Sequence, residues 1–140
     1  MAINFSNEQQ LAIDSRGQNI IVSAGAGSGK TAVLTERIRK LLRSGIKANE
    51  LLVLTFTNAA AAEMKERIVK AMSKDELLNN RTSEVDSAYI TTFDSFSLSV
   101  VKKYHDRLNL TKNIGVIDGS ILNVQKRKII NTYIIKPTAK

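Results

Sequence analysis

Apolar and polar positions along the first hundred residues predict short buried strands that alternate with amphipathic helices. Three segments are too apolar or too β-branched for exposed loops and predict strands, at 19–23, 51–56 and 88–91. Four stretches carry apolar residues at helical spacing and predict helices, at 9–15, 30–44, 58–71 and 93–104. Ser6 or Asn7 is the expected cap of the first helix, and Asn58 that of the third. The polar segment 73–87 predicts a loop with at most one helical turn.

This order of elements predicts an α/β fold. A strand that returns through a helix to a parallel strand makes a right-handed crossover, so helices cover both faces of a parallel sheet. A chain of 140 residues, 43% of them hydrophobic, is long enough for one such domain and too short for two.

Composition limits the compartment and the kinds of site. The sequence contains no cysteine, which excludes disulfides and thiolate metal sites and fits a reducing environment. No apolar run approaches the length that spans a bilayer, and the N-terminus lacks a signal-peptide pattern. We therefore expect a cytoplasmic protein without a membrane partner.

Positive charge is concentrated toward the C-terminal end. Residues 1–100 hold 12 Lys and Arg against 11 Asp and Glu, whereas residues 101–140 hold 9 against 2. Basic clusters at 102–107 and 126–128 can neutralise nucleic-acid phosphates, although a solvated helix face has the same composition. Charge therefore supports a nucleic-acid partner without identifying one.

The segment between the first predicted strand and the following helix predicts a phosphate-binding loop. Its glycines permit a tight turn whose N–H groups approach phosphate oxygens, because no Cβ blocks a positive φ. Lys30 brings a positive charge to the phosphates and Thr31 a hydroxyl ligand to Mg²⁺, so these two are the candidate catalytic residues. The predicted nucleotide-binding residues of the loop are Ala24, Gly25, Ala26, Gly27, Ser28, Gly29, Lys30 and Thr31.

One position of the loop departs from the usual pattern, since Ala24 stands where glycine is expected. The three glycines nearest the phosphates remain. The alternative interpretation is a glycine-rich turn followed by a surface lysine. Because parallel strands end at one edge of a sheet, we expect the loop, residues 55–58 and residues 92–95 to lie along the same edge.

Four blocks of the sequence resemble, in order and spacing, the beginning of UvrD/Rep-type superfamily 1 DNA helicases. The blocks are Phe5-Ser-Asn-Glu-Gln9-Gln-Leu-Ala-Ile13, the loop at 24–31, Leu54-Thr-Phe-Thr-Asn58-Ala-Ala-Ala-Ala-Glu63-Met64-Lys-Glu-Arg67-Ile68 and Thr91-Thr-Phe-Asp-Ser-Phe96. Ala32 and Ala59, where many members have Arg and Lys, resemble the AddA branch of bacterial helicase-nuclease proteins. Asp94 departs from the family, in which histidine is more usual at that place.

The resemblance implies a three-layer P-loop NTPase (RecA-like) sheet, incomplete in this chain, with a helical C-terminal tail. It places residues 1–112 in the N-terminal portion of the first helicase motor domain and residues 113–140 at the start of an inserted helical subdomain. The implied activity is ATP-dependent translocation on single-stranded DNA with Mg²⁺, in the 3′ to 5′ direction. The implied partners are a second motor domain in the same protein and, from the AddA branch, a nuclease partner.

The resemblance also implies roles for individual residues. Gln9 resembles a glutamine that reads the adenine edge, and a surface helix glutamine is the alternative. The residues that resemble contacts to single-stranded DNA are Thr55, Phe56, Thr57, Asn58, Thr92 and Ser95. An aromatic side chain at a strand end stacks on any base, whereas core packing is the alternative for Phe56. Helix capping is the alternative for Thr92 and Ser95.

An ATPase of this kind also needs an acidic pair after an apolar strand, to hold Mg²⁺ and to orient the attacking water. Asp118 is the nearest candidate, but Gly119 follows it where Glu is expected. We therefore predict ATP binding with negligible hydrolysis by this chain, as an N-terminal piece of a longer helicase. A stand-alone P-loop module of small-molecule kinase type is the alternative function, and an interaction domain without a nucleotide is a third.

Overall fold

The computed structural model describes residues 4–117 and 119–133. The chain divides into two compact units, residues 1–98 and residues 99–140, which are described separately below. Asp118, the candidate acidic residue of the sequence, lies outside the described residues. Within the described ranges, no helix combines the length and the apolar composition needed to cross a membrane.

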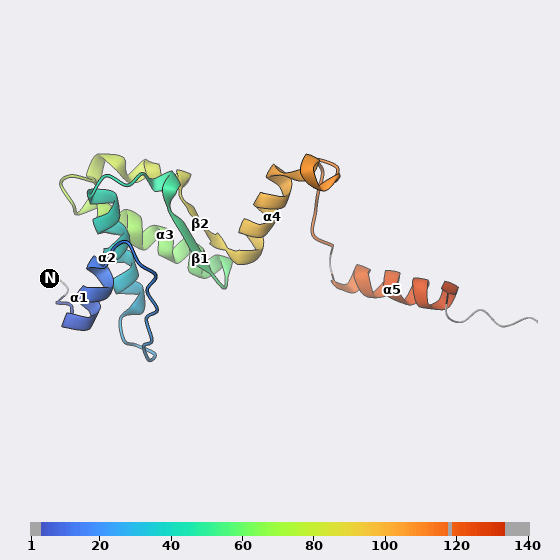
Figure 1. Ribbon diagram of the computed structural model, residues 1–140, viewed down its shortest axis with the longest axis horizontal. Coiled ribbons are helices and arrows are strands. Elements are labelled where there is room, and N and C mark those ends of the chain that lie inside the picture. Colours follow the sequence, from blue (N-terminus) through green and yellow to red (C-terminus); the bar gives the residue numbers. More distant parts are fainter. Residues whose placement is uncertain (1–3, 118, 134–140) are drawn as a thin grey trace, which may run out of the picture. The chain divides into compact units, whose positions relative to one another are not determined.

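The first unit combines helices with a two-stranded parallel sheet (Figure 1). Its elements in chain order are α1 (Asn7–Asp14), α2 (Lys30–Arg43), the 3₁₀ helix η1 (Ala48–Glu50), β1 (Leu52–Thr55), α3 (Asn58–Ser73), the 3₁₀ helix η2 (Asn79–Ser87), β2 (Tyr89–Thr92) and the beginning of α4 (Phe93–Lys103). In the sheet, Leu52 is opposite Tyr89 and Thr55 is opposite Thr92. The connection between the parallel strands runs through α3, as the alternating pattern predicts.

Local sequence signals explain where the helices begin and end. Ser6 caps α1, because its hydroxyl accepts the N–H of Gln9 and the Gln9 side chain accepts the N–H of Ser6. Gly45, with φ of +98°, follows the C-terminus of α2 in the left-handed conformation that favours glycine. The cap of α3 is Thr57, whose hydroxyl accepts the N–H of Ala60, and not Asn58 as the sequence suggested.

The hydrophobic core lies where α2, α3, β1 and η2 meet. Its buried residues are Ile38, Leu42, Ala48, Val53, Met64, Ile68, Met72, Leu78 and Val85. Each large aliphatic side chain removed from water stabilises the fold by about 1.5–3 kcal/mol before entropy is subtracted. The core therefore fixes one end of α2 and leaves the other end, where the phosphate loop enters, to polar contacts.

Two sequence predictions of secondary structure are wrong. Residues 19–23 form no strand, and Ile21 is 97% exposed, because this run has no hydrogen-bonded strand beside it among the described residues. Residues 79–87 form the 3₁₀ helix η2 where a loop was expected, because Leu78 and Val85 are buried in the core and hold the polar segment against it. The α/β class is confirmed as helices around a small parallel sheet.

The second unit is helical in its described residues. It contains the end of α4, the 3₁₀ helix η3 (His105–Leu108) and α5 (Gly119–Tyr133). Asn109 ends η3 with φ of +51°, a conformation that asparagine tolerates better than most residues. The expected helix in the C-terminal region is therefore present as α5.

Candidate nucleotide-binding site

The predicted phosphate loop forms a tight turn directly before α2. Gly27 and Gly29 have φ of +74° and +81°, so both positions require the freedom that glycine provides. The N–H of Ser28 donates to the carbonyl of Gly25 across the turn at 3.4 Å. Because α2 starts at Lys30, the unpaired N–H groups of its first turn and its dipole favour an anion at the loop.

The side chain of Lys30 reaches back across the loop. Its Nζ donates to the carbonyl oxygens of Ala24 at 2.8 Å and Gly25 at 2.6 Å. The ammonium is exposed and has no carboxylate partner among the described residues. Its positive charge is therefore available at the loop to a phosphate group, which the two neutral carbonyls do not neutralise.

A buried hydroxyl of the loop supports a polar ligand. The Oγ atom of Ser28 is buried and has no hydrogen-bond partner among the residues that the structure describes. Unpaired buried polar atoms are rare in folded proteins and call for a specific explanation. A bound phosphate group beside the loop would supply acceptor oxygens, so the donor set of this site fits a nucleotide.

Gln9 connects α1 to the loop. Its Oε1 accepts the N–H of Ser6 at 2.9 Å, and its Nε2 donates to the carbonyl of Ser28 at 3.0 Å. The side chain is therefore not a free surface glutamine. One N–H and one lone pair of the amide are left for another partner, so adenine recognition by Gln9 stays a prediction.

The first segment predicted to contact DNA presents an aromatic side chain to solvent. Phe56 is fully exposed, which excludes the alternative that it packs in the core. The hydroxyl of Thr55 donates to the carbonyl of Thr57 at 3.0 Å, and Thr57 caps α3. Asn58 is exposed at the start of that helix. This strand end therefore offers a free aromatic ring beside a helix N-terminus.

The second predicted DNA segment has its hydroxyl groups engaged with each other. Thr92 Oγ1 donates to Ser95 Oγ at 2.9 Å and accepts the N–H of Ser95 at 3.2 Å, which is a helix-capping arrangement for α4. Pairing of Thr55 with Thr92 brings both segments to the same edge of the sheet, as expected. In Figure 1 the loop before α2 lies apart from that edge.

The comparisons with known proteins identify the family. Residues 5–138 match the family model described as the UvrD/REP helicase N-terminal domain. The chain belongs to this family. The resemblance inferred from four sequence blocks is therefore confirmed, and the loop at 24–31 is the phosphate-loop segment of a UvrD/REP helicase N-terminal domain.

Relatives within the UvrD/REP family agree with the AddA branch. The AddA protein of Lactobacillus acidophilus, one component of an ATP-dependent helicase/nuclease, is 46% identical over 121 residues, which cover 81% of this chain and 10% of the relative. Proteins of the same name from Heliobacterium modesticaldum and Clostridium perfringens are 40% and 41% identical over 91% and 93% of the chain. The chain spans about a tenth of the length of the curated relatives it matches.

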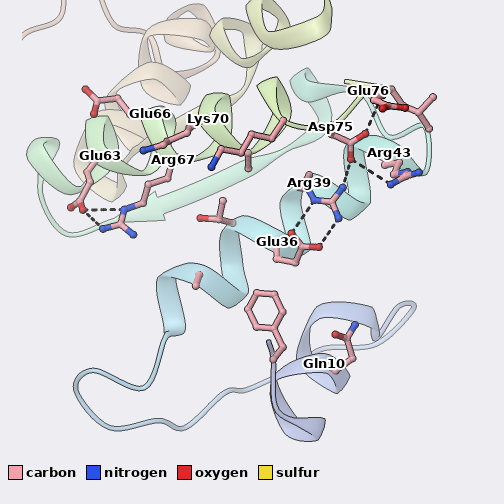
Figure 2. Close-up of a pocket in the computed structure, with 16 residues that line it drawn as sticks. Gln10, Glu36, Arg39, Arg43, Glu63, Glu66, Arg67, Lys70, Asp75 and Glu76 are labelled. Carbon is pink, nitrogen blue, oxygen red and sulfur yellow. Dashed lines mark hydrogen bonds and ion pairs between the residues drawn. The ribbon is translucent and has the colours of Figure 1, made fainter. Parts of the chain in front are cut away.

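A charged groove between α2 and α3 was not predicted from the sequence. It has a volume of about 1300 Å³ and carries acidic and basic side chains in similar number (Figure 2). Arg39 donates to both carboxylate oxygens of Glu36, at 2.6 and 2.9 Å, and also pairs with Asp75. Arg43 lies 3.6 Å from the same carboxylate of Asp75. The spacing of Glu36, Arg39 and Arg43 along α2 is the sequence signal for this network.

Asp75 connects the end of α3 to α2. Burial opposes ionisation of its carboxylate, but the N–H of Leu77 and the guanidinium groups of Arg43 and Arg39 outweigh burial and lower its pKa. The hydrogen bonds of Glu36 are the main cause that raises the pKa of Arg39. With its charges paired in this way, the groove favours no ligand of one charge, and its evident role is to hold α2 and α3 together.

Proposed function

We propose that this chain carries the first half of the nucleotide site of an ATP-dependent DNA helicase that translocates on single-stranded DNA. The observation that carries the proposal is the glycine turn at the start of α2, over which the Lys30 ammonium is held by carbonyl oxygens only. Family membership supports it, because the curated relatives are named as components of an ATP-dependent helicase/nuclease. The complete sheet would be a three-layer RecA-like one.

ATP and Mg²⁺ are the proposed ligands of the loop. The N–H groups from Gly27 to Thr31 would hold the β- and γ-phosphates, Lys30 would stabilise charge that develops there, and the Thr31 hydroxyl would bind Mg²⁺. Bound MgATP supplies the phosphoryl group whose transfer to water drives movement. Gln9 would favour adenine over other bases.

Single-stranded DNA is the proposed substrate of the sheet edge. Phe56 would stack on a base regardless of its identity, while Thr55, Thr57 and Asn58 would bind phosphate oxygens at the start of α3. Thr92 and Ser95 would extend this contact if their mutual hydrogen bond is exchanged for one to DNA. The 3′ to 5′ direction, a cytoplasmic location, a second motor domain and a nuclease partner follow from the resemblance to AddA.

Assays of turnover and DNA binding test this proposal. We expect weak ATP binding and negligible hydrolysis by the 140-residue chain, because the loop has no acidic pair beside it in the described residues. Turnover that vanishes in Lys30→Ala would contradict the half-site. Binding of a single-stranded oligonucleotide at low salt separates a helicase segment from a small-molecule kinase, which has no use for the exposed Phe56. Undetectable binding, unchanged in Phe56→Ala, would favour the kinase-type alternative.

A further inference from the structure

The contacts between α1 and α2 assign a role to an arginine that the nucleotide site itself does not include. We propose that Arg37 is a positioning residue: it holds α1 on α2 and so fixes Gln9 at the phosphate loop. The inference rests on the proposed function, because it gives adenine selectivity a support outside the loop. Arg37 and Gln9 both line a cavity of about 490 Å³ beside the loop.

Arg37 binds the C-terminal carbonyls of α1. Its Nη1 donates to the carbonyl of Ala12 at 2.6 Å and reaches that of Ile13 at 3.4 Å. The last carbonyls of a helix have no partner within it, and positive charge is favourable at that end of the helix dipole. Arg16 adds a second guanidinium, 2.7 Å from the Ile13 carbonyl, but it belongs to the segment after α1 and does not join α1 to α2.

The helix that Arg37 holds cannot be stable without tertiary contacts. It has eight residues, well below the length at which isolated helices form in water. Two other contacts join it to α2: the fully buried side chain of Ile13 and the ion pair between Asp14 and Lys40 at 2.8 Å. The ion pair is solvent-exposed and contributes little. Arg37 and Ile13 therefore dominate the docking of α1.

The other end of α1 carries the group that touches the loop. Gln9 Nε2 donates to the Ser28 carbonyl at 3.0 Å, and a Cβ added at Gly29 would lie 3.3 Å from the same nitrogen. The amide is thus packed closely against the loop backbone. Arg37 secures one end of this short helix and Gln9 contacts the loop from the other end, so release of the first end displaces the second.

A double-mutant cycle on nucleotide affinity tests the coupling. Fluorescent ATP and GTP analogues are titrated into the chain and into Gln9→Ala, Arg37→Ala and the double variant. We expect each single change to weaken ATP binding about tenfold and to remove the preference for ATP over GTP. The double variant should lose no more than either single one, because both changes remove the same amide from the site.

Two further variants separate positioning from a general loss of structure. Arg37→Lys should recover part of the ATP preference, since an ammonium still reaches one carbonyl of α1. Arg67→Ala, which removes an exposed arginine paired with Glu63 on α3, should bind both nucleotides like the unchanged chain. Independent effects of Arg37→Ala and Gln9→Ala that multiply, or an unaltered ATP preference in Arg37→Ala, would overturn the inference.

Amide hydrogen exchange of α1 distinguishes failure of this inference from failure of the proposed function. Arg37→Ala should raise exchange at residues 10–14 while exchange in the core helices stays slow. If the unchanged chain binds neither nucleotide, the proposed function fails whatever α1 does. Unchanged exchange in α1 of Arg37→Ala would overturn the docking role even if ATP binds.

Discussion

The two ends of α2 differ in what surrounds them. Toward its C-terminus, Ile38 and Leu42 are almost completely buried against α3 and η2. At its N-terminus, Lys30 and Thr31 are exposed after a glycine turn that polar contacts hold. One helix therefore joins a region that determines stability to a region that determines ligand chemistry, and substitutions at the two ends should change different measurements.

The largest expected effect is on the buried end. Ile68→Ala removes a side chain that is 1% exposed in the core and should lower the free energy of unfolding by about 3 kcal/mol. Urea unfolding followed by circular dichroism measures this change. The matched control is Ile21→Ala, an isoleucine that is 97% exposed near the loop and should leave stability unchanged. Equal losses for both variants would contradict the division of the molecule.

Removal of the Asp75 charge should have the next largest effect. Asp75→Asn should cost about 2 kcal/mol of unfolding free energy at neutral pH, because the carboxylate accepts bonds from Leu77 and Arg39. The lowered pKa of Asp75 means that its contribution is complete above its ordinary value of 3.8 and is lost as the pH falls further.

The pH dependence of this variant gives a second readout. The unfolding free energy of the unchanged chain should fall more steeply below about pH 4 than that of Asp75→Asn. Asp86→Asn breaks an exposed ion pair with Lys65 and should keep the steep fall. Parallel curves for the unchanged chain and Asp75→Asn would show that the buried carboxylate does not couple to folding.

Phe56→Ala should affect ligand binding without affecting stability. The ring is fully exposed, so its removal leaves the core intact, whereas loss of one stacked base weakens single-stranded DNA binding about tenfold. Fluorescence anisotropy with a labelled oligonucleotide at low salt measures the affinity. Leu77→Ala removes another exposed apolar side chain, beside the charged groove, and should bind DNA normally. A drop in melting temperature for Phe56→Ala would contradict its exposure.

The smallest expected effect is at Thr57, which belongs to both regions. Thr57→Ala removes the cap of α3 and should cost about 1 kcal/mol of unfolding free energy. Thr57→Ser keeps the hydroxyl and should retain most of the stability. If the serine variant is as unstable as the alanine variant, the cap does not explain the role of Thr57.

The sequence predicts the helices and the paired strands well because their signals are local. Ser6 with Gln9 forms a capping box, and the apolar spacing of α2 faces the core that the structure shows. The strand predicted at 19–23 fails because a strand is completed by its neighbour, which an apolar run does not specify. The same limit hid η2, whose burial depends on contacts with α2 and α3 that are distant in sequence.

The candidate site was only partly predictable for the same reason. The glycine turn and Lys30 follow from adjacent residues, and the structure places them as a phosphate loop requires. The contact of Gln9 with Ser28 and that of Arg37 with Ala12 join residues 19 and 25 positions apart. Such pairs become visible only once α1 has docked on α2.

Titration of the chain with MgATP tests the central claim most directly. Calorimetry should show saturable binding to the unchanged chain and to Lys70→Ala, which removes an exposed lysine of α3. Lys30→Ala should bind at least about tenfold more weakly at unchanged melting temperature, because the charge held over the loop is gone. Equal affinity of Lys30→Ala and the unchanged chain for MgATP would contradict the assignment of this loop as a nucleotide site.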